Sequence, residues 1–107
     1  MKVVWHLDAQ EDLHAIQVWL ATKRPRAARA LREAIGAAIE LAREYPLAGR
    51  VAVGFRSDET LRELLVSNYR VLYRVHPERL LVLRVWDGRR EGNPEIAGER
   101  LATYFAG

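Results

Sequence analysis

The stretch from Leu61 to Arg90 most constrains the fold, because apolar and arginine side chains alternate along much of it. Successive side chains of a strand point to opposite faces, so alternation predicts strands with one apolar face and one cationic face. We expect a hairpin of strands Tyr69–Val75 and Leu80–Trp86, preceded by a strand over Leu61–Val66. The predicted core face of the hairpin carries Val71, Tyr73, Val75, Leu81, Leu83 and Val85, and the opposite face carries Arg70, Leu72, Arg74, Val82, Arg84 and Trp86.

The two faces of this hairpin align in only one register. A shift of one residue would place Arg70 and Arg74 on the core face, where no partner for their charge is visible. The turn around His76–Arg79 is therefore predicted to hold an odd number of residues. The resulting sheet has an apolar face that can pack in a core and a cationic face that can bind an anionic partner.

The N-terminal half of the chain predicts a strand and two helices. Lys2–Leu7 is rich in β-forming residues, and Asp8, with an acid three residues on, has the pattern of a capping box that starts a helix. A second helix is expected from Pro25, which suits a first helical turn, and its apolar stripe runs to about Glu44. Small residues near this stripe, Gly36 among them, favour close packing of the two helices as a hairpin.

The predicted architecture is therefore α+β, with the element order β-α-α-β-β-β. The N-terminal strand and the helical hairpin pack on one face of a small, mainly antiparallel sheet. Residues 94–105 form an optional short C-terminal helix. The chain has 107 residues and shows no linker or internal repeat, so residues 1–107 are predicted to form a single domain.

Composition and missing motifs exclude several classes of protein. The chain has no cysteine, so neither a disulfide nor a thiolate metal site can form. No apolar run approaches the roughly 20 residues of a membrane span, and the N-terminus lacks the pattern of a signal peptide, so we expect a cytoplasmic protein. Glycine-rich phosphate loops and the common hydrolase motifs are absent, and the three histidines are far apart in sequence. We therefore expect no metal and no cofactor.

Arginine dominates the charge of residues 61–90, with seven arginines against three acids. Guanidinium groups pair bidentately with phosphate and can stabilise the charge that develops during strand cleavage, although they cannot act as ordinary general bases. Trp86 lies on the same predicted face and could stack on a nucleotide base. In the alternative interpretation, the arginines pair with Glu63, Asp87 and Glu91, and Trp86 only covers a strand end.

Several short motifs occur in an order and spacing that, taken together, are fairly specific. They are DAQEDLHAI at 8–16, PRAARAL at 25–31, PLAGR at 46–50, REL at 62–64, YRVLYR at 69–74 and VLRVWDGRR at 82–90. Over nearly its whole length, the chain resembles the RelE/ParE superfamily of bacterial toxins.

This resemblance implies a toxin of a type II toxin–antitoxin system, held inactive by a small antitoxin in a hetero-oligomer. RelE-type members cut ribosome-bound mRNA without a metal, whereas ParE-type members poison DNA gyrase, so the fold alone does not choose between them. The RelE-type pattern implies catalytic roles for Arg70 and Arg90. The other members of the cationic face are then predicted to bind RNA: Arg62, Arg74, Arg84, Trp86 and Arg89.

The sequence also departs from the RelE-type pattern. Arg62 and Glu63 stand where the nucleases tend to carry lysines, and Asp87 stands where many relatives have a histidine. The C-terminal tyrosine position falls near Ile96, with Tyr104 as a substitute from the tail. Ribosome-dependent mRNA cleavage is our first hypothesis, gyrase poisoning is the alternative, and a non-toxic binding module is the third. In each toxin hypothesis the antitoxin tail should be acidic or amphipathic, because it must cover a cationic and partly apolar surface.

Overall fold

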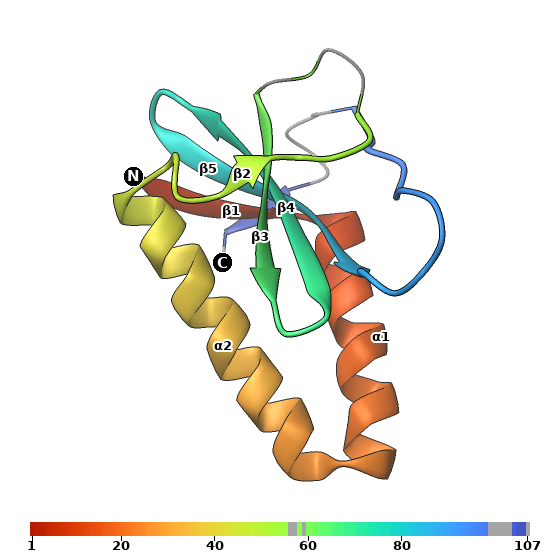
Figure 1. The fold of residues 1–107 in the computed structure, drawn as a ribbon. Coiled ribbons are helices and arrows are strands. Elements are labelled where there is room, and N and C mark those ends of the chain that lie inside the picture. Colours follow the sequence, from red (N-terminus) through yellow and green to blue (C-terminus); the bar gives the residue numbers. More distant parts are fainter. Residues whose placement is uncertain (56–57, 59, 99–103, 107) are drawn as a thin grey trace.

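A computed structural model of the chain describes residues 1–55, 58, 60–98 and 104–106. It confirms the α+β architecture, with strands before and after a pair of helices (Figure 1). In chain order the elements are β1 (Lys2–His6), α1 (Leu7–Lys23), α2 (Pro25–Glu44), β2 (Arg50–Val51), β3 (Leu61–Val66), β4 (Tyr69–His76), β5 (Arg79–Asp87) and β6 (Tyr104–Ala106). Neither helix is both long and apolar enough to cross a membrane, as far as the chain is described.

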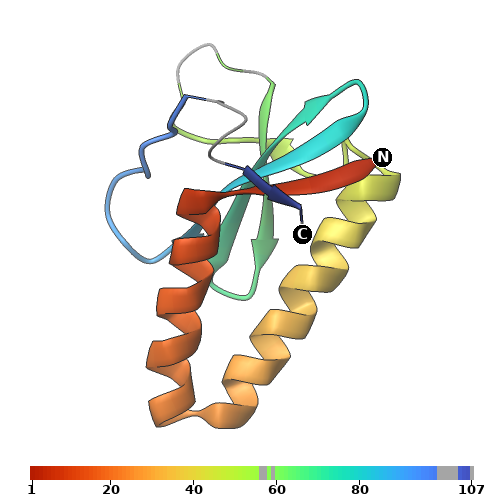
Figure 2. The ribbon, with the colours of Figure 1, turned by 180° about the vertical axis from the view of Figure 1, so that it is seen from behind.

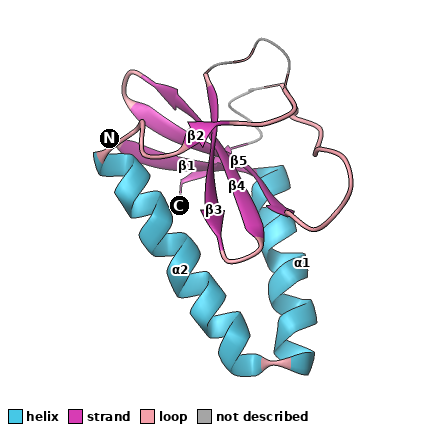
Figure 3. Ribbon diagram, in the orientation of Figure 1, coloured by secondary structure: helices cyan, strands magenta, loops and turns pink. Residues whose placement is uncertain are grey.

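The six strands form one sheet in the order β2-β3-β4-β5-β1-β6. Figure 3 shows the strands in magenta, from the same side as Figure 1. Neighbouring strands are antiparallel, except that β1 runs parallel to β5. The predicted C-terminal helix is wrong where this segment is described, because residues 94–98 are not helical and Tyr104–Ala106 pair with β1. The outer edge of β1 offers unpaired backbone groups, and an extended segment satisfies them where a helix could not.

Both helices begin and end through local backbone chemistry. His6, rather than Asp8, caps α1, because the Nδ1 atom of His6 accepts a hydrogen bond of 3.0 Å from the amide of Asp8. The predicted capping box is therefore wrong, and α1 begins at Leu7. Pro25 opens α2 and Glu44 ends it, as the sequence predicts, since the residue before Pro46 avoids the helical region.

The two helices diverge from their junction at Arg24 like the arms of a V, with the end of the β3–β4 hairpin between them (Figures 1 and 2). They are thus not the closely packed hairpin that we expected. A Cβ atom added to Gly36 would meet no atom within 4 Å, so this glycine does not allow a close approach of the helices.

The main core lies between the helices and the sheet. Its helical side is the apolar stripe of α2 together with Ala9 of α1. The stripe follows the prediction at Leu31, Ile35 and Ala42. It also buries Ile39, which the prediction left out, whereas Tyr45, which the prediction included, is exposed. The buried members are Ala9, Leu31, Ile35, Ile39, Ala42, Val66, Tyr69, Val71, Tyr73, Leu80, Val82 and Val85. Burial of this apolar surface is what holds the helices to the sheet.

A β-bulge changes the register of the central hairpin. Up to Leu72 the pairing of β4 with β5 follows the predicted register, but from Tyr73 onward it is shifted by one residue, which leaves Leu83 as the extra residue. The turn then holds two residues between the paired His76 and Arg79. The predicted odd-numbered turn is therefore wrong, because the bulge, and not the turn, brings the two faces into alignment.

The bulge also reassigns side chains of β5 to the other face. Val82 faces the helices, whereas Leu81 and Leu83 lie on the opposite face of the sheet, which we call the outer face. There they join a second buried cluster with Val4, Ala52, Leu61 and Leu72, and against it pack Phe55, Trp86 and Ile96. The outer face is thus largely apolar and covered by the segments that follow β2 and β5, rather than open and cationic.

Candidate functional site

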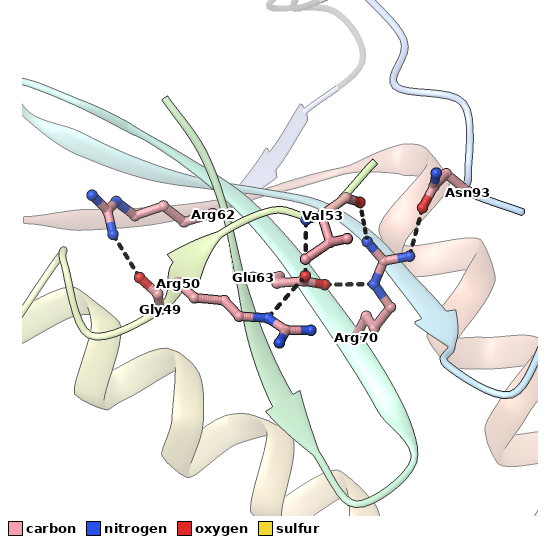
Figure 4. Close-up of polar contacts among 7 residues, drawn as sticks. All are labelled: Gly49, Arg50, Val53, Arg62, Glu63, Arg70 and Asn93. Atoms are coloured by element: carbon pink, nitrogen blue, oxygen red, sulfur yellow. Dashed lines mark hydrogen bonds and ion pairs between the residues drawn. The ribbon is translucent and has the colours of Figure 1, made fainter. Parts of the chain in front are cut away.

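Arg70 lies on β4 at the outer face, and each of its three guanidinium nitrogens donates a hydrogen bond (Figure 4). Its Nε donates to Glu63 at 2.5 Å, one terminal nitrogen donates to the Asn93 side chain at 2.8 Å, and the other donates to the carbonyl of Val53 at 2.9 Å. The Arg70 side chain is only 12% exposed. Arg70 therefore ties three segments of the chain together across the outer face.

Glu63, the centre of this network, is a carboxylate that is almost completely buried. Besides Arg70 it accepts hydrogen bonds of 3.1 Å from the Nε of Arg50 and from the amide of Val53. Burial alone would raise the pKa of Glu63, but the hydrogen bonds from Arg70 and Val53 and the charges of Arg70 and Arg50 outweigh it. The net pKa lies below its usual value, so Glu63 is ionised at neutral pH.

Arg62 lies next to Glu63 in sequence but points to the other side of β3, away from Arg70 (Figure 4). It donates to the carbonyl of Gly49 at 2.7 Å. The adjacent loop is fixed by the buried hydroxyl of Tyr73, which accepts from the Gly49 amide at 2.9 Å and donates to the carbonyl of Pro46 at 2.8 Å. The PLAGR motif at 46–50 is thus held in place by Arg62 and Tyr73, which is a structural role for both residues.

Arg74 lies further along β4, toward the turn into β5, and pairs with the loop before β3. One terminal nitrogen of Arg74 contacts the carboxylate of Asp58, and its Nε donates to the Thr60 hydroxyl at 3.1 Å. The Thr60 hydroxyl, followed by the charge of Arg74, lowers the pKa of Asp58 from its ordinary value. Arg74 is thus neutralised by a carboxylate that stays ionised.

Arg84 connects β5 to the first turns of α1. Its Nε and one terminal nitrogen donate to the two oxygens of Asp12 at 2.7 and 2.9 Å, and the other nitrogen donates to the carbonyl of Glu95 at 2.9 Å. Asp12 also accepts from the amide of Val85 at 3.0 Å. The bidentate hydrogen bond to Asp12 raises the pKa of Arg84. Asp12 was not among the partners that we considered from the sequence.

The remaining predicted residues gather at the end of β5. The guanidinium of Arg90 lies 4.0 Å from the centre of the Trp86 ring, and that of Arg84 lies 5.5 Å from it. Arg89 pairs with Asp87 at 3.0 Å, and this contact lowers the pKa of Asp87. The Nε1 atom of Trp86 is buried and has no hydrogen-bond partner in the described part of the chain.

The structure thus brings together part of the predicted site. Arg84, Trp86 and Arg90 form one cluster, and Arg70 lies opposite Trp86 in the next strand. The two remaining strand residues are elsewhere: Arg62 faces the other way, and Arg74 lies beyond the bulge. The alternative in which carboxylates neutralise the arginines is confirmed for Glu63 and Asp87. Tyr104 lies in β6, and its side chain is outside the described residues.

The described residues offer no group of three or more potential ligands that could hold a metal ion. A cavity of about 520 Å³ does lie between the arms of the V, beside the β3–β4 turn. It is mostly apolar, and its lining includes Trp19, Leu20, Ala30, Ala34 and Tyr69. Apolar concavities of this size suit an apolar segment of a binding partner.

Residues 3–92 match the family described as ParE toxin of type II toxin-antitoxin system, parDE. This match covers most of the chain. The chain belongs to the ParE toxin family. It is therefore a toxin of a type II toxin–antitoxin system within the RelE/ParE superfamily, as the motifs predicted.

Two similar proteins agree with this family. The chain is 34% identical over 84 residues to Toxin RelE1 of Caulobacter vibrioides, a match that covers 75% of this chain and 85% of the relative. Its fold matches a solved structure titled Chromosomal ParDE TA system from P. aeruginosa, with a TM-score of 0.67 and 21% identity, covering 81% of this chain and 95% of the other. At this identity the structural match establishes the fold alone.

Proposed function

We propose that this toxin arrests growth by binding its target in the cytoplasm, with DNA gyrase as that target, as ParE-type toxins do. The proposal places gyrase poisoning before mRNA cleavage, which reverses the order that the sequence suggested. One observation carries it: each of the three guanidinium nitrogens of Arg70, the residue that the family pattern makes catalytic, already donates a hydrogen bond, to Glu63, Asn93 and Val53. A phosphate that paired with the Nε of this group would have to displace a buried carboxylate from it.

Displacement of Glu63 would be costly. A buried carboxylate that loses its cation keeps a desolvation penalty of several kcal/mol, in the range of about 3–5 kcal/mol for a broken buried pair. Arg74 and Arg84 are likewise engaged with Asp58 and Asp12. The outer face therefore offers little free positive charge for positioning an RNA backbone, which favours a toxin that acts by contact alone.

Ribosome-dependent mRNA cleavage is the second candidate, and two observations favour it. One is the likeness to a protein named Toxin RelE1. The other is Arg90, which forms no salt bridge among the described residues, although its charge contributes to the lowered pKa of Asp87, and which lies against Trp86, an arrangement that could accept a nucleotide base and its phosphate.

We also propose that the cavity between the helices receives an apolar segment of the antitoxin. Because carboxylates of the chain already neutralise most outer-face arginines, the antitoxin gains more from covering apolar surface than from neutralising charge. Ala34→Glu places a charge at this cavity and should abolish rescue by the antitoxin while growth arrest persists. Ala37→Glu, on the same helix but outside the cavity lining, is the matched control and should keep rescue. Equal rescue of both variants would contradict this docking site.

The decisive experiment is to induce the toxin alone in bacteria and follow incorporation of labelled thymidine and labelled amino acids. DNA synthesis should stop first and the SOS response should be induced, and purified toxin should trap gyrase on cleaved DNA. Early loss of translation, with mRNA cut inside codons, would instead establish the second candidate.

Arg90→Ala separates the two candidates by mutation. Arg90 forms no ion pair within the described residues and packs on the Trp86 ring, so its loss should disturb the fold only slightly, and toxicity should persist if the toxin is not a nuclease. Arg70→Ala is a poor probe, because it would strand Glu63 in the core and could remove toxicity by unfolding the protein. Loss of toxicity in folded Arg90→Ala, with Arg79→Ala unaffected, would count against gyrase as the target.

A further inference from the structure

The densest positive charge of the chain lies outside the outer face, in the segment KRPRAARALR at 23–32. This segment holds five cations and no acid, whereas the whole chain has a net charge of only +3. The rest of the molecule is therefore net acidic. We call these five residues the helix corner: Lys23, Arg24, Arg26, Arg29 and Arg32.

The helix corner begins at the junction of α1 and α2, at the tip of the V, where Lys23 and Arg24 line the cavity between the arms (Figures 1 and 2). It extends along α2 to Arg32, which lines a second cavity with Trp5 and Glu11. All five side chains are exposed. None of them forms an ion pair with a carboxylate in the described ranges 1–55, 58 and 60–98. The N-terminus of the 20-residue helix α2 lies here as well, and its dipole adds to the positive potential.

Over the length of the corner, duplex DNA presents more anionic charge than a single strand or an acidic peptide. Arg26 and Arg32 are six residues apart on α2, a distance of about 9 Å along the helix axis. Duplex DNA carries about five phosphate charges over that length, and a single strand about half as many. Even an extended chain made only of acidic residues presents about three charges over the same distance.

One aromatic ring also lies beside the corner. Trp19 is 54% exposed, and the ammonium of Lys23 lies 5.6 Å from its centre, over the ring. Such a ring can stack on a base of a single strand. The preference for a duplex phosphate backbone therefore depends on charge density alone, and competition with a single strand tests it.

We propose that the helix corner binds the phosphate backbone of duplex DNA without sequence preference. This site is separate from the outer face and does not depend on whether the toxin acts on gyrase. Five phosphate contacts predict that affinity falls with salt with a log–log slope of about −4.5, or roughly 500-fold between 50 and 200 mM.

Binding of the purified full-length toxin to a fluorescein-labelled duplex of mixed sequence, followed by anisotropy across this salt range, tests the proposal. The double variant R26Q/R29Q should bind more weakly, and its slope should fall to about −2.7, or roughly 40-fold over the same range. R43Q/R79Q changes the net charge equally at sites remote from the corner and should retain the wild-type slope. A circular dichroism melt of each variant shows that it remains folded.

Two competitors distinguish duplex DNA from other anions. Unlabelled duplex should displace the probe more effectively than a single strand of equal length, and both should outcompete poly-L-glutamate at equal charge. The proposal is overturned if wild type does not bind the duplex, or if R26Q/R29Q and R43Q/R79Q lose affinity equally. It is also overturned if the single strand competes better than the duplex, or if poly-L-glutamate competes as well, which would assign the corner to an acidic protein partner.

Discussion

The outer face of the sheet and the helix corner carry similar numbers of arginines but differ in what surrounds them. On the outer face, Arg70, Arg74 and Arg84 each contact a carboxylate from another part of the chain. At the helix corner, Arg26 and Arg29 have no such contact within the described residues. The outer-face arginines hold the fold together, whereas the corner arginines keep their charge available to a partner.

A cationic stripe in a sequence therefore does not predict a cationic surface. An arginine pointing away from the main core can still be enclosed when loops cover that face, and it then needs a buried acid. Glu63 fulfils this need for Arg70, at 1% exposure. Alternation along a strand indicates which side a charge is on, but not whether another residue neutralises it.

Glu63→Ala should have the largest effect, because it leaves Arg70 and Arg50 without their shared carboxylate. We expect a loss of about 3–5 kcal/mol in the free energy of unfolding and a fall in Tm of more than about 12 °C. Thermal and urea unfolding would measure it. The matched control is Glu40→Ala, which removes an exposed carboxylate paired with Arg43 and should cost far less. Equal effects of the two substitutions would mean that the outer face is no more enclosed than the surface of α2.

Arg84→Ala should have the next largest effect, because it leaves Asp12 partly buried without its cation and loosens α1 from β5. The side chains of both partners are 17% exposed, so we expect a loss of about 2 kcal/mol, less than for a fully buried pair. Arg89→Ala removes the more exposed arginine that pairs with Asp87, and it should lower the free energy of unfolding much less. If urea midpoints of the two variants coincide, the enclosed and exposed arginines of this region do not differ as we infer.

Acid should weaken the outer face through Glu63. Since its folded pKa lies below the ordinary value of 4.5, the unfolded state binds the proton more readily, and the pair stabilises the fold fully above that value. This stability is lost as pH falls below about 4.5 through the folded pKa. Urea unfolding at pH 7, 4 and 3 should show a steeper loss for wild type than for Glu63→Gln. Parallel losses would place the acid sensitivity elsewhere, for example at Asp58 or Asp87.

The smallest effect on stability is expected at the helix corner. R26Q/R29Q removes two exposed charges that hold nothing in place, so Tm should change by less than about 4 °C even though DNA binding weakens. Differential scanning calorimetry would measure the change. A large loss of stability would show that the corner arginines, like those of the outer face, serve the fold.

The elements of the fold follow from local patterns and were therefore predictable. The start of α2 at Pro25, its end at Glu44 and its buried stripe all depend on neighbouring residues. The strands β3 to β5 also lie close to their predicted positions. Signals of this kind come from residues that are close together in the chain, within one or two helical turns or neighbouring strands. A prediction from sequence can use such local signals.

The bulge and the carboxylate partners were not predictable in the same way. No glycine or turn residue marks Leu83 as an extra residue. The one-residue shift of register is seen only in the folded sheet, where it places Val82 on the face toward the helices. Asp12 and Arg84 are 72 residues apart in the chain, so only the folded topology brings them together. The partner of Glu63 could be predicted only weakly. Glu63 is two residues from Leu61 and so lies on the same face of β3, where a buried acid needs a cation.

The position of β1 has a consequence for how the sheet is completed. Among the described strands, β1 pairs with β5 and β6, which follow it by more than 70 residues. Lys2–His6 therefore have no strand partner until Arg79–Asp87 are present and folded. A chain cut before β5 leaves both edges of β1 unpaired and cannot complete the sheet.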